Sequence, residues 1–105
     1  MISIKPGAKL DGLRPEMVLA IVVAGQVYES NQADLELVVT EATGGQHMVG
    51  SLHASGRAVD LRTRDVSPVM LPIIVAELRH RLGAHYDVVL ETASPHIHVE
   101  FDPKL

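Results

Sequence analysis

The sequence predicts an α+β domain with a mostly antiparallel sheet and two helices packed on one face. Two stretches carry apolar residues at helical spacing, and four shorter stretches are rich in β-branched and apolar residues. Their order is helix, strand, strand, helix, strand, strand, which is typical of this class. We expect one domain over residues 1–105, because a chain of 105 residues rarely divides into two cores.

The first helix is predicted to begin at Pro15, since a proline followed by an acid, here Glu16, is typical of a helix start. Residues 1–13, which precede it, are expected to form an irregular lead-in. The helix should continue to about Ser30. Its expected apolar face consists of Met17, Val18, Ile21, Val22, Gly25 and Tyr28.

Two strands are expected after this helix. Residues 35–41 are apolar and β-branched and stop before a Gly-Gly turn signal. Residues 57–63 alternate, which places Val59 and Leu61 on one face of the strand and Asp60 on the other.

The second half of the chain predicts a helix and a hairpin. A Ser-Pro pair is expected to begin a helix over residues 67–81, although Pro72 makes its first turn irregular, and Gly83 is the expected C-cap. Residues 86–92 and 96–101 are strand-like and are separated by a short break, so we expect them to form a hairpin.

The composition excludes several classes of function. A formal net charge of -4 argues against a nucleic-acid partner, because phosphate binding needs a basic face. The longest unbroken apolar run, residues 17–24, is too short to span a bilayer, so no membrane contact is expected. No signal peptide is recognisable, and we expect a cytoplasmic monomer. The lack of cysteine excludes disulfides, thiol nucleophiles and cysteine-ligated zinc.

The last predicted strand combines an apolar face with a chemically active one. A period of two places His96, His98 and Glu100 on one face and the apolar residues between them on the other. The polar face is either exposed to solvent or lines a site, and an isolated His-x-His leaves both interpretations open.

A second group of polar residues lies in the segment SLHASGRAVD at residues 51–60. Its His53 and Asp60 flank Gly56, which permits a tight turn, and small Ala58 leaves room above the carboxylate of Asp60. Imidazole nitrogens and a carboxylate oxygen are ordinary zinc ligands, and a catalytic zinc takes three of them. The alternative interpretation is structural, with His53 as an ordinary turn histidine and Asp60 as an ordinary aspartate at a strand end. The presence of two further histidines in the last strand makes a coincidence of this kind less attractive.

These residues resemble a known superfamily. SLHASGRAVDL at 51–61 followed by HIHVEF at 96–101 is similar to the signature S-x-H-x-x-G-x-A-x-D and H-x-H. D-alanyl-D-alanine carboxypeptidases and dipeptidases, other peptidoglycan metallopeptidases and the hedgehog signalling domain share that signature. The nearest likeness is to the hedgehog domain and its bacterial relatives, where VVTE, a histidine six residues before His53, and LE before HIH recur in the same order. The resemblance covers roughly residues 35–102.

The resemblance implies a zinc site and its neighbours. It makes His53, Asp60 and His98 the zinc ligands. It places His96 and His47 beside the metal without binding it, where they donate to the carbonyl oxygen or the tetrahedral intermediate.

The resemblance also implies a general base. Glu91 would take a proton from the attacking water and return it to the leaving amine. It lies seven residues before His98, close to the hedgehog-like spacing of six, whereas the carboxypeptidase branch has its glutamate where this chain has Pro95. Glu100 shares the face of His98 and is the rival base, with a solvated edge residue as its simpler interpretation.

Substrate and calcium binding follow from the same comparison. Ser51 matches a residue that holds the substrate carboxylate in the D,D-peptidases, and Arg57 is a weaker candidate for that task. Residues 41–43 replace a stretch that carries an arginine in the peptidase branch. Hedgehog domains have an acidic calcium cluster here, but residues 42–46 contain no acid and Glu41 stands alone, so no calcium site is expected.

Two functions are therefore predicted. The first is a zinc-dependent peptidase that hydrolyses peptidoglycan peptide bonds, as a D-Ala-type carboxypeptidase or an endopeptidase, acting on a stem peptide or another short peptide. Such an enzyme would reach the cell wall by lysis or holin release. The alternative is a non-catalytic, zinc-stabilised binding module of hedgehog-like type, which the missing arginine and the displaced glutamate favour.

Overall fold

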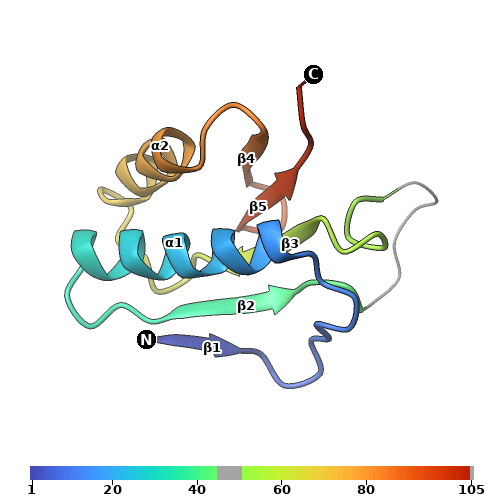
Figure 1. Ribbon diagram of the computed structural model, residues 1–105. Coiled ribbons are helices and arrows are strands. Elements are labelled where there is room, and N and C mark those ends of the chain that lie inside the picture. The colour runs from blue at the N-terminus through green and yellow to red at the C-terminus, as the bar shows by residue number, and fades with distance from the viewer. Residues whose placement is uncertain (45–50, 105) are drawn as a thin grey trace.

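A computed structural model describes residues 1–44 and 51–104 as a five-stranded sheet with two helices (Figure 1). The predicted α+β class is confirmed. In chain order the elements are β1 (Ile2–Ile4), α1 (Pro15–Asn31), β2 (Leu37–Glu41), β3 (Ala58–Arg62), α2 (Leu71–Leu82), β4 (Tyr86–Glu91) and β5 (His96–Phe101).

The sheet has the strand order β1-β2-β3-β5-β4 and is mostly antiparallel, as predicted. Only β1 and β2 run parallel to each other. The predicted hairpin is β4 and β5, but β5 also pairs with β3, which precedes it by a whole helix and strand. This pairing places Asp60 opposite His98, and Arg62 opposite His96. Two motifs that are far apart in the sequence thus meet in the centre of the sheet.

The hydrophobic core lies between the sheet and the two helices, which contact each other. The central strands contribute one face to it: Val59 and Leu61 of β3, and Ile97 and Val99 of β5, are at most 1% exposed. Period-two alternation then directs Asp60 and its neighbours to the opposite face. Within residues 1–44 and 51–104, no helix is long and apolar enough to cross a membrane.

The buried side of α1 agrees with the predicted one at Met17, Ile21, Gly25 and Tyr28 and differs from it elsewhere. Val18 and Val22 are 51% and 45% exposed, whereas Ala20, Ala24 and Val27 are buried. The helix is apolar around most of its circumference, so periodicity alone could not select the face that packs on the sheet. Small alanines at the contact let the helix approach the sheet closely.

The expectation of an irregular lead-in over residues 1–13 is wrong. Residues Ile2–Ile4 form β1, and the Lys5 N–H donates to the Val39 carbonyl at 2.9 Å. A turn follows in which the Ala8 N–H donates back to Lys5, with Pro6 and a left-handed Gly7 (φ 92°) at its centre, as in a type II turn. A strand of three residues is too short to show alternation, which explains the error.

The remaining boundaries shift by a few residues. α2 begins at Leu71 and not at residue 67, and it is preceded by a turn in which the Ser67 carbonyl accepts the backbone N–H groups of Met70 and Leu71. Pro72 then stands in the first turn of the helix, where it costs no hydrogen bond. Gly83 ends α2 with φ 85°, as expected of a C-cap. Strands β2, β3 and β4 are one or two residues shorter than predicted.

Candidate metal centre

The pairing of β3 with β5 brings the polar residues of both motifs together on the helix-free face of the sheet. Asp60 lies opposite His98, and the Nδ1 atom of His98 is 3.0 Å from the Oδ1 atom of Asp60. His96 is the next residue along that face, with its Nε2 atom 3.5 Å from the same oxygen. The predicted face of β5 is therefore directed at one carboxylate.

His53 reaches the same carboxylate from the turn that precedes β3. Its Nε2 atom is 3.2 Å from Asp60 Oδ1, and the residue is only 6% exposed. Gly56 closes the turn by donating its N–H to the His53 carbonyl at 3.0 Å, and its φ of 76° favours glycine. A Cβ atom on Gly56 would lie 2.1 Å from the carbonyl oxygen of Gly12, so no other residue fits there.

All three histidines use their second ring nitrogen to hold their orientation. In each case that nitrogen faces an oxygen that can only accept a hydrogen bond, so this nitrogen carries a proton and fixes the ring orientation, and the other nitrogen faces Asp60. The pairs are His53 Nδ1 with the Ala42 carbonyl at 2.8 Å, His96 Nδ1 with the Ser94 carbonyl at 2.6 Å, and His98 Nε2 with Glu100 Oε1 at 2.8 Å.

The spacing of these atoms suits a small cation. In a tetrahedral zinc site with bonds of 2.0–2.1 Å, the ligand atoms are about 3.3 Å apart. The two nitrogens of His53 and His98 lie 3.2 and 3.0 Å from Asp60 Oδ1, and the three ligand atoms are all within 4.8 Å of one another. These three residues could therefore hold a metal ion, and they are the three that the sequence suggested.

The charges in the cluster reinforce each other. Burial alone raises the pKa of Asp60, but hydrogen bonds and charge from His53 and His98 outweigh it and hold that pKa far below its usual range. Burial lowers the pKa of His53, yet the Asp60 carboxylate more than compensates and the pKa is raised. The hydrogen bond to Asp60 raises the pKa of His98, with a further contribution from Glu100. The Asp60 carboxylate therefore keeps its negative charge near neutral pH.

The two candidate bases lie in different surroundings. Glu91 ends the edge strand β4 opposite His96, so it is a diagonal neighbour of His98, about 7–8 Å away between Cα atoms. Its side chain is exposed and makes no hydrogen bond or ion pair with the described part of the chain. Glu100 is not the solvated edge residue of the simpler interpretation, because its carboxylate accepts the Nε2–H of His98.

Two further sequence-predicted residues, Ser51 and Arg57, make other contacts than those of the cluster. The Ser51 hydroxyl accepts the backbone N–H of His53 at 3.2 Å, so it supports the turn that carries this ligand. Arg57 is half-buried directly before β3, and its carbonyl accepts the Phe101 N–H at 2.8 Å. His47 lies outside the described residues.

The comparison with known families agrees with this arrangement. The family model of the hedgehog amino-terminal signalling domain matches residues 16–100. The chain belongs to this family. The match runs from the first turn of α1 to β5 and so includes every residue of the cluster, and it agrees with the superfamily that the motifs indicated. No curated protein matches the chain.

Sequence reasoning missed two parts of this hedgehog-family site. The carbonyls of Ala42 and Ser94 orient two histidines, but a backbone carbonyl leaves no trace in the sequence. The N-terminal segment also contributes, since the Thr43 N–H donates to the Lys9 carbonyl at 2.9 Å and the Arg14 N–H donates to Gly56 at 3.0 Å. The Pro-Gly pair of its turn was the one available signal.

Proposed function

We propose that this hedgehog-family domain binds zinc through His53, Asp60 and His98 and hydrolyses peptide bonds of peptidoglycan, as a D-Ala-type carboxypeptidase or an endopeptidase. One observation carries the proposal. Two imidazole nitrogens and one carboxylate oxygen converge at ligand spacing, while the other nitrogen of each imidazole is tied to an acceptor. Zinc sites that hold such a nitrogen and oxygen set and keep one position open are typical of hydrolases.

The chemistry divides between the metal and the side chains around it. Zinc supplies Lewis acidity, which polarises a carbonyl and makes a water acidic near neutral pH. The ionised Asp60 and the two oriented imidazoles hold it. His96 has its Nδ1 atom committed to Ser94, so in its protonated form it can donate from Nε2 to the substrate's carbonyl oxygen. His47 is proposed for the same task.

Glu91 is the proposed general base, and its exposure suits that role. A carboxylate that makes no hydrogen bond to the described residues keeps its acceptor capacity for water, and its position diagonal to His98 in the β4–β5 pair supports this assignment. Ser51 and Arg57 are proposed to contact the substrate carboxylate. Lysis or holin release from the cytoplasm stays the proposed route to the wall.

The test is the substitution Glu91→Gln, which removes the base without changing the size of the side chain. We expect stoichiometric zinc by metal analysis and loss of turnover on purified peptidoglycan fragments, read by mass spectrometry. Glu29→Gln is the matched control, because Glu29 is exposed on α1, away from the centre. Unchanged turnover in Glu91→Gln would refute Glu91 as the base.

A second candidate is a zinc-stabilised binding module without hydrolysis. It is favoured by the family match, which is to a signalling domain, and by the place of Glu91 on an edge strand one strand beyond His98. Under this proposal zinc mainly stabilises the fold. Its removal should lower the melting temperature, and peptidoglycan digested with the zinc-loaded protein should be unchanged. Fragments in that digest would exclude the module and support the peptidase.

A further inference from the structure

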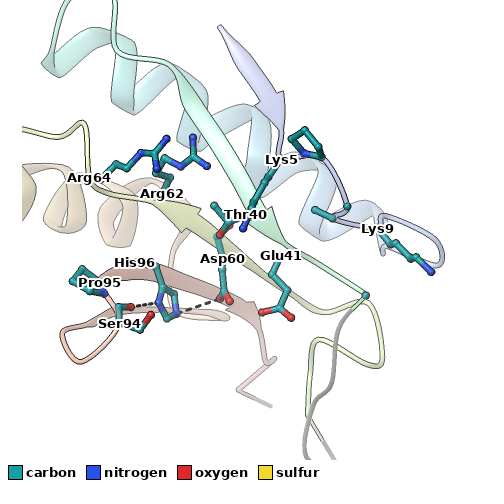
Figure 2. Close-up of a pocket in the computed structure, with 14 residues that line it drawn as sticks. Lys5, Lys9, Thr40, Glu41, Asp60, Arg62, Arg64, Ser94, Pro95 and His96 are labelled. Carbon is teal, nitrogen blue, oxygen red and sulfur yellow. Dashed lines mark hydrogen bonds and ion pairs between the residues drawn. The ribbon is translucent and has the colours of Figure 1, made fainter.

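A cleft of about 770 Å³ opens beside the candidate metal centre (Figure 2). The turn after β1 forms one wall, and the end of β3 with the β4–β5 turn forms the other. Asp60 and His96 belong to its lining, so a ligand in the cleft contacts the metal cluster directly. Its volume is in the range of cavities that hold small ligands and short peptides.

The cleft is basic although the chain as a whole is acidic. Its lining holds four cationic and two acidic side chains, and the chain's formal net charge is -4. One of the two acids, Asp60, faces His53 and His98 and belongs to the candidate metal centre. None of the four cations makes an ion pair within the part of the chain that the structure describes. The four are Lys5, Lys9, Arg62 and Arg64.

Three of these cations are placed to act together. Figure 2 shows the Lys5 ammonium directed toward Thr40, on the Asp60 side of the cleft, whereas Lys9 is turned away from the cluster. Arg62 and Arg64 are two residues apart near the end of β3 and lie next to each other in this view. Such unpaired cations around a concave surface favour an anionic ligand.

The strand register sets the distance between charge and reaction centre. Arg62 lies opposite His96 and is two residues beyond Asp60 on the same face of β3. The Cα atoms of Asp60 and Arg62 are therefore about 6.6 Å apart. One residue of an extended peptide spans about 3.3–3.6 Å. A peptide that extends a few residues from the centre can therefore place a side-chain carboxylate within reach of Arg62.

We propose that this cleft selects acidic peptides, with Lys5, Arg62 and Arg64 pairing with side-chain carboxylates next to the metal centre. An arginine guanidinium pairs well with a carboxylate through two hydrogen bonds. A long polyanion such as nucleic acid fits less well, because the cleft is short and the rest of the chain repels it. The proposal names the substrate class of the proposed peptidase and rests on that function for its biological meaning.

Binding to the metal-free protein tests the proposal without any turnover. The probes are a dye-labelled hexapeptide with two glutamates and blocked ends, and the same peptide with both glutamates replaced by glutamine. In the presence of a chelator, fluorescence anisotropy should show the acidic peptide binding about tenfold more tightly, as one charge-assisted contact gives. This preference should shrink as salt is raised.

Variants assign the preference to the cleft. Arg62→Gln with Arg64→Gln, and separately Lys5→Gln, should reduce it to about twofold or less, whereas Arg81→Gln on α2 should leave it unchanged. Equal binding of both peptides, no effect of the cleft variants, or tighter binding of a single-stranded oligonucleotide of equal charge would overturn the proposal. If the protein hydrolyses peptidoglycan but lacks this preference, the proposal for the cleft is refuted and the proposed peptidase activity is retained. If it binds acidic peptides without hydrolysis, the proposal for the cleft is retained and the peptidase activity is refuted.

Discussion

The two faces of β3 are both buried at residues 60 and 61 but are built for different purposes. Leu61 is fully buried and its neighbour Asp60 is 8% exposed, yet their side chains point to opposite sides of β3. The helices cover Leu61 with aliphatic side chains, whereas the turn of His53 and the strand of His98 cover Asp60 with imidazoles. Stability is thus concentrated on one face and chemistry on the other, with only the backbone between them.

The largest expected effect separates the faces at neighbouring residues. Leu61→Ala should lower the free energy of unfolding by about 2–5 kcal/mol, because it leaves a cavity in the core. Its zinc affinity, measured by competition with a chromophoric chelator, should stay within a few-fold of wild type. Asp60→Asn should show the opposite pattern. Its zinc affinity should fall by a large factor, whereas the free energy of unfolding of the metal-free protein should change less than in Leu61→Ala. A large loss of zinc affinity in folded Leu61→Ala would show that the faces are coupled.

The next effect concerns Glu100, which is not a candidate zinc ligand but contacts the candidate ligand His98. Glu100→Ala should weaken zinc binding about 10–100-fold, because His98 loses the acceptor that fixes its tautomer. Glu100→Gln should recover part of the affinity, since its amide oxygen still accepts the Nε2–H. Asp102→Ala is the control, because Asp102 is exposed and pairs with Lys104. Equal affinities in all three variants would contradict this role.

Sequence patterns predicted one face of the sheet better than the connections around it. The fold class, α1 and the hairpin followed from periodicity, and the alternation along β5 correctly assigned His98 and Ile97 to opposite faces. The three candidate ligands followed from a motif whose residue types must be present for zinc chemistry. What could not be predicted depends on the folded chain: a short parallel strand, the packed side of an apolar helix, and the carbonyl of Ala42.

A smaller effect is expected where a core residue supports the site face. Tyr28 is fully buried on α1, and its hydroxyl donates to the carbonyl of Arg62 at 2.9 Å. Tyr28→Phe should lower the free energy of unfolding by about 0.5–1.5 kcal/mol, because the carbonyl loses its partner. Chemical denaturation measures this loss. Tyr86→Phe removes a half-buried hydroxyl that donates a hydrogen bond to the backbone carbonyl of Glu16, and it should lower the free energy of unfolding by less than Tyr28→Phe. The reverse order would remove Tyr28 as a link between the faces.

The smallest expected effect is the pH dependence of the metal-free protein, because burial opposes the influence of Asp60 on each histidine. The pKa values of His53 and His98 are raised on folding, so their contribution is complete below the unfolded value of about 6.5 and is lost as pH rises through the folded values. The lowered pKa of Asp60 gives a contribution that is present above about pH 3.9 and is lost in stronger acid.

The free energy of unfolding of the chelated protein should therefore be highest between about pH 4 and 6.5 and fall toward pH 8. Zinc should cancel this fall, because it binds the histidines in their neutral form and its affinity increases with pH. His53→Ala should flatten the metal-free profile, whereas His80→Ala, an exposed position on α2, should not. If the chelated wild-type protein gained stability from pH 6.5 to 8, the pKa values of these histidines would be lowered on folding. That result would contradict the proposed pairing of His53 and His98 with the Asp60 carboxylate.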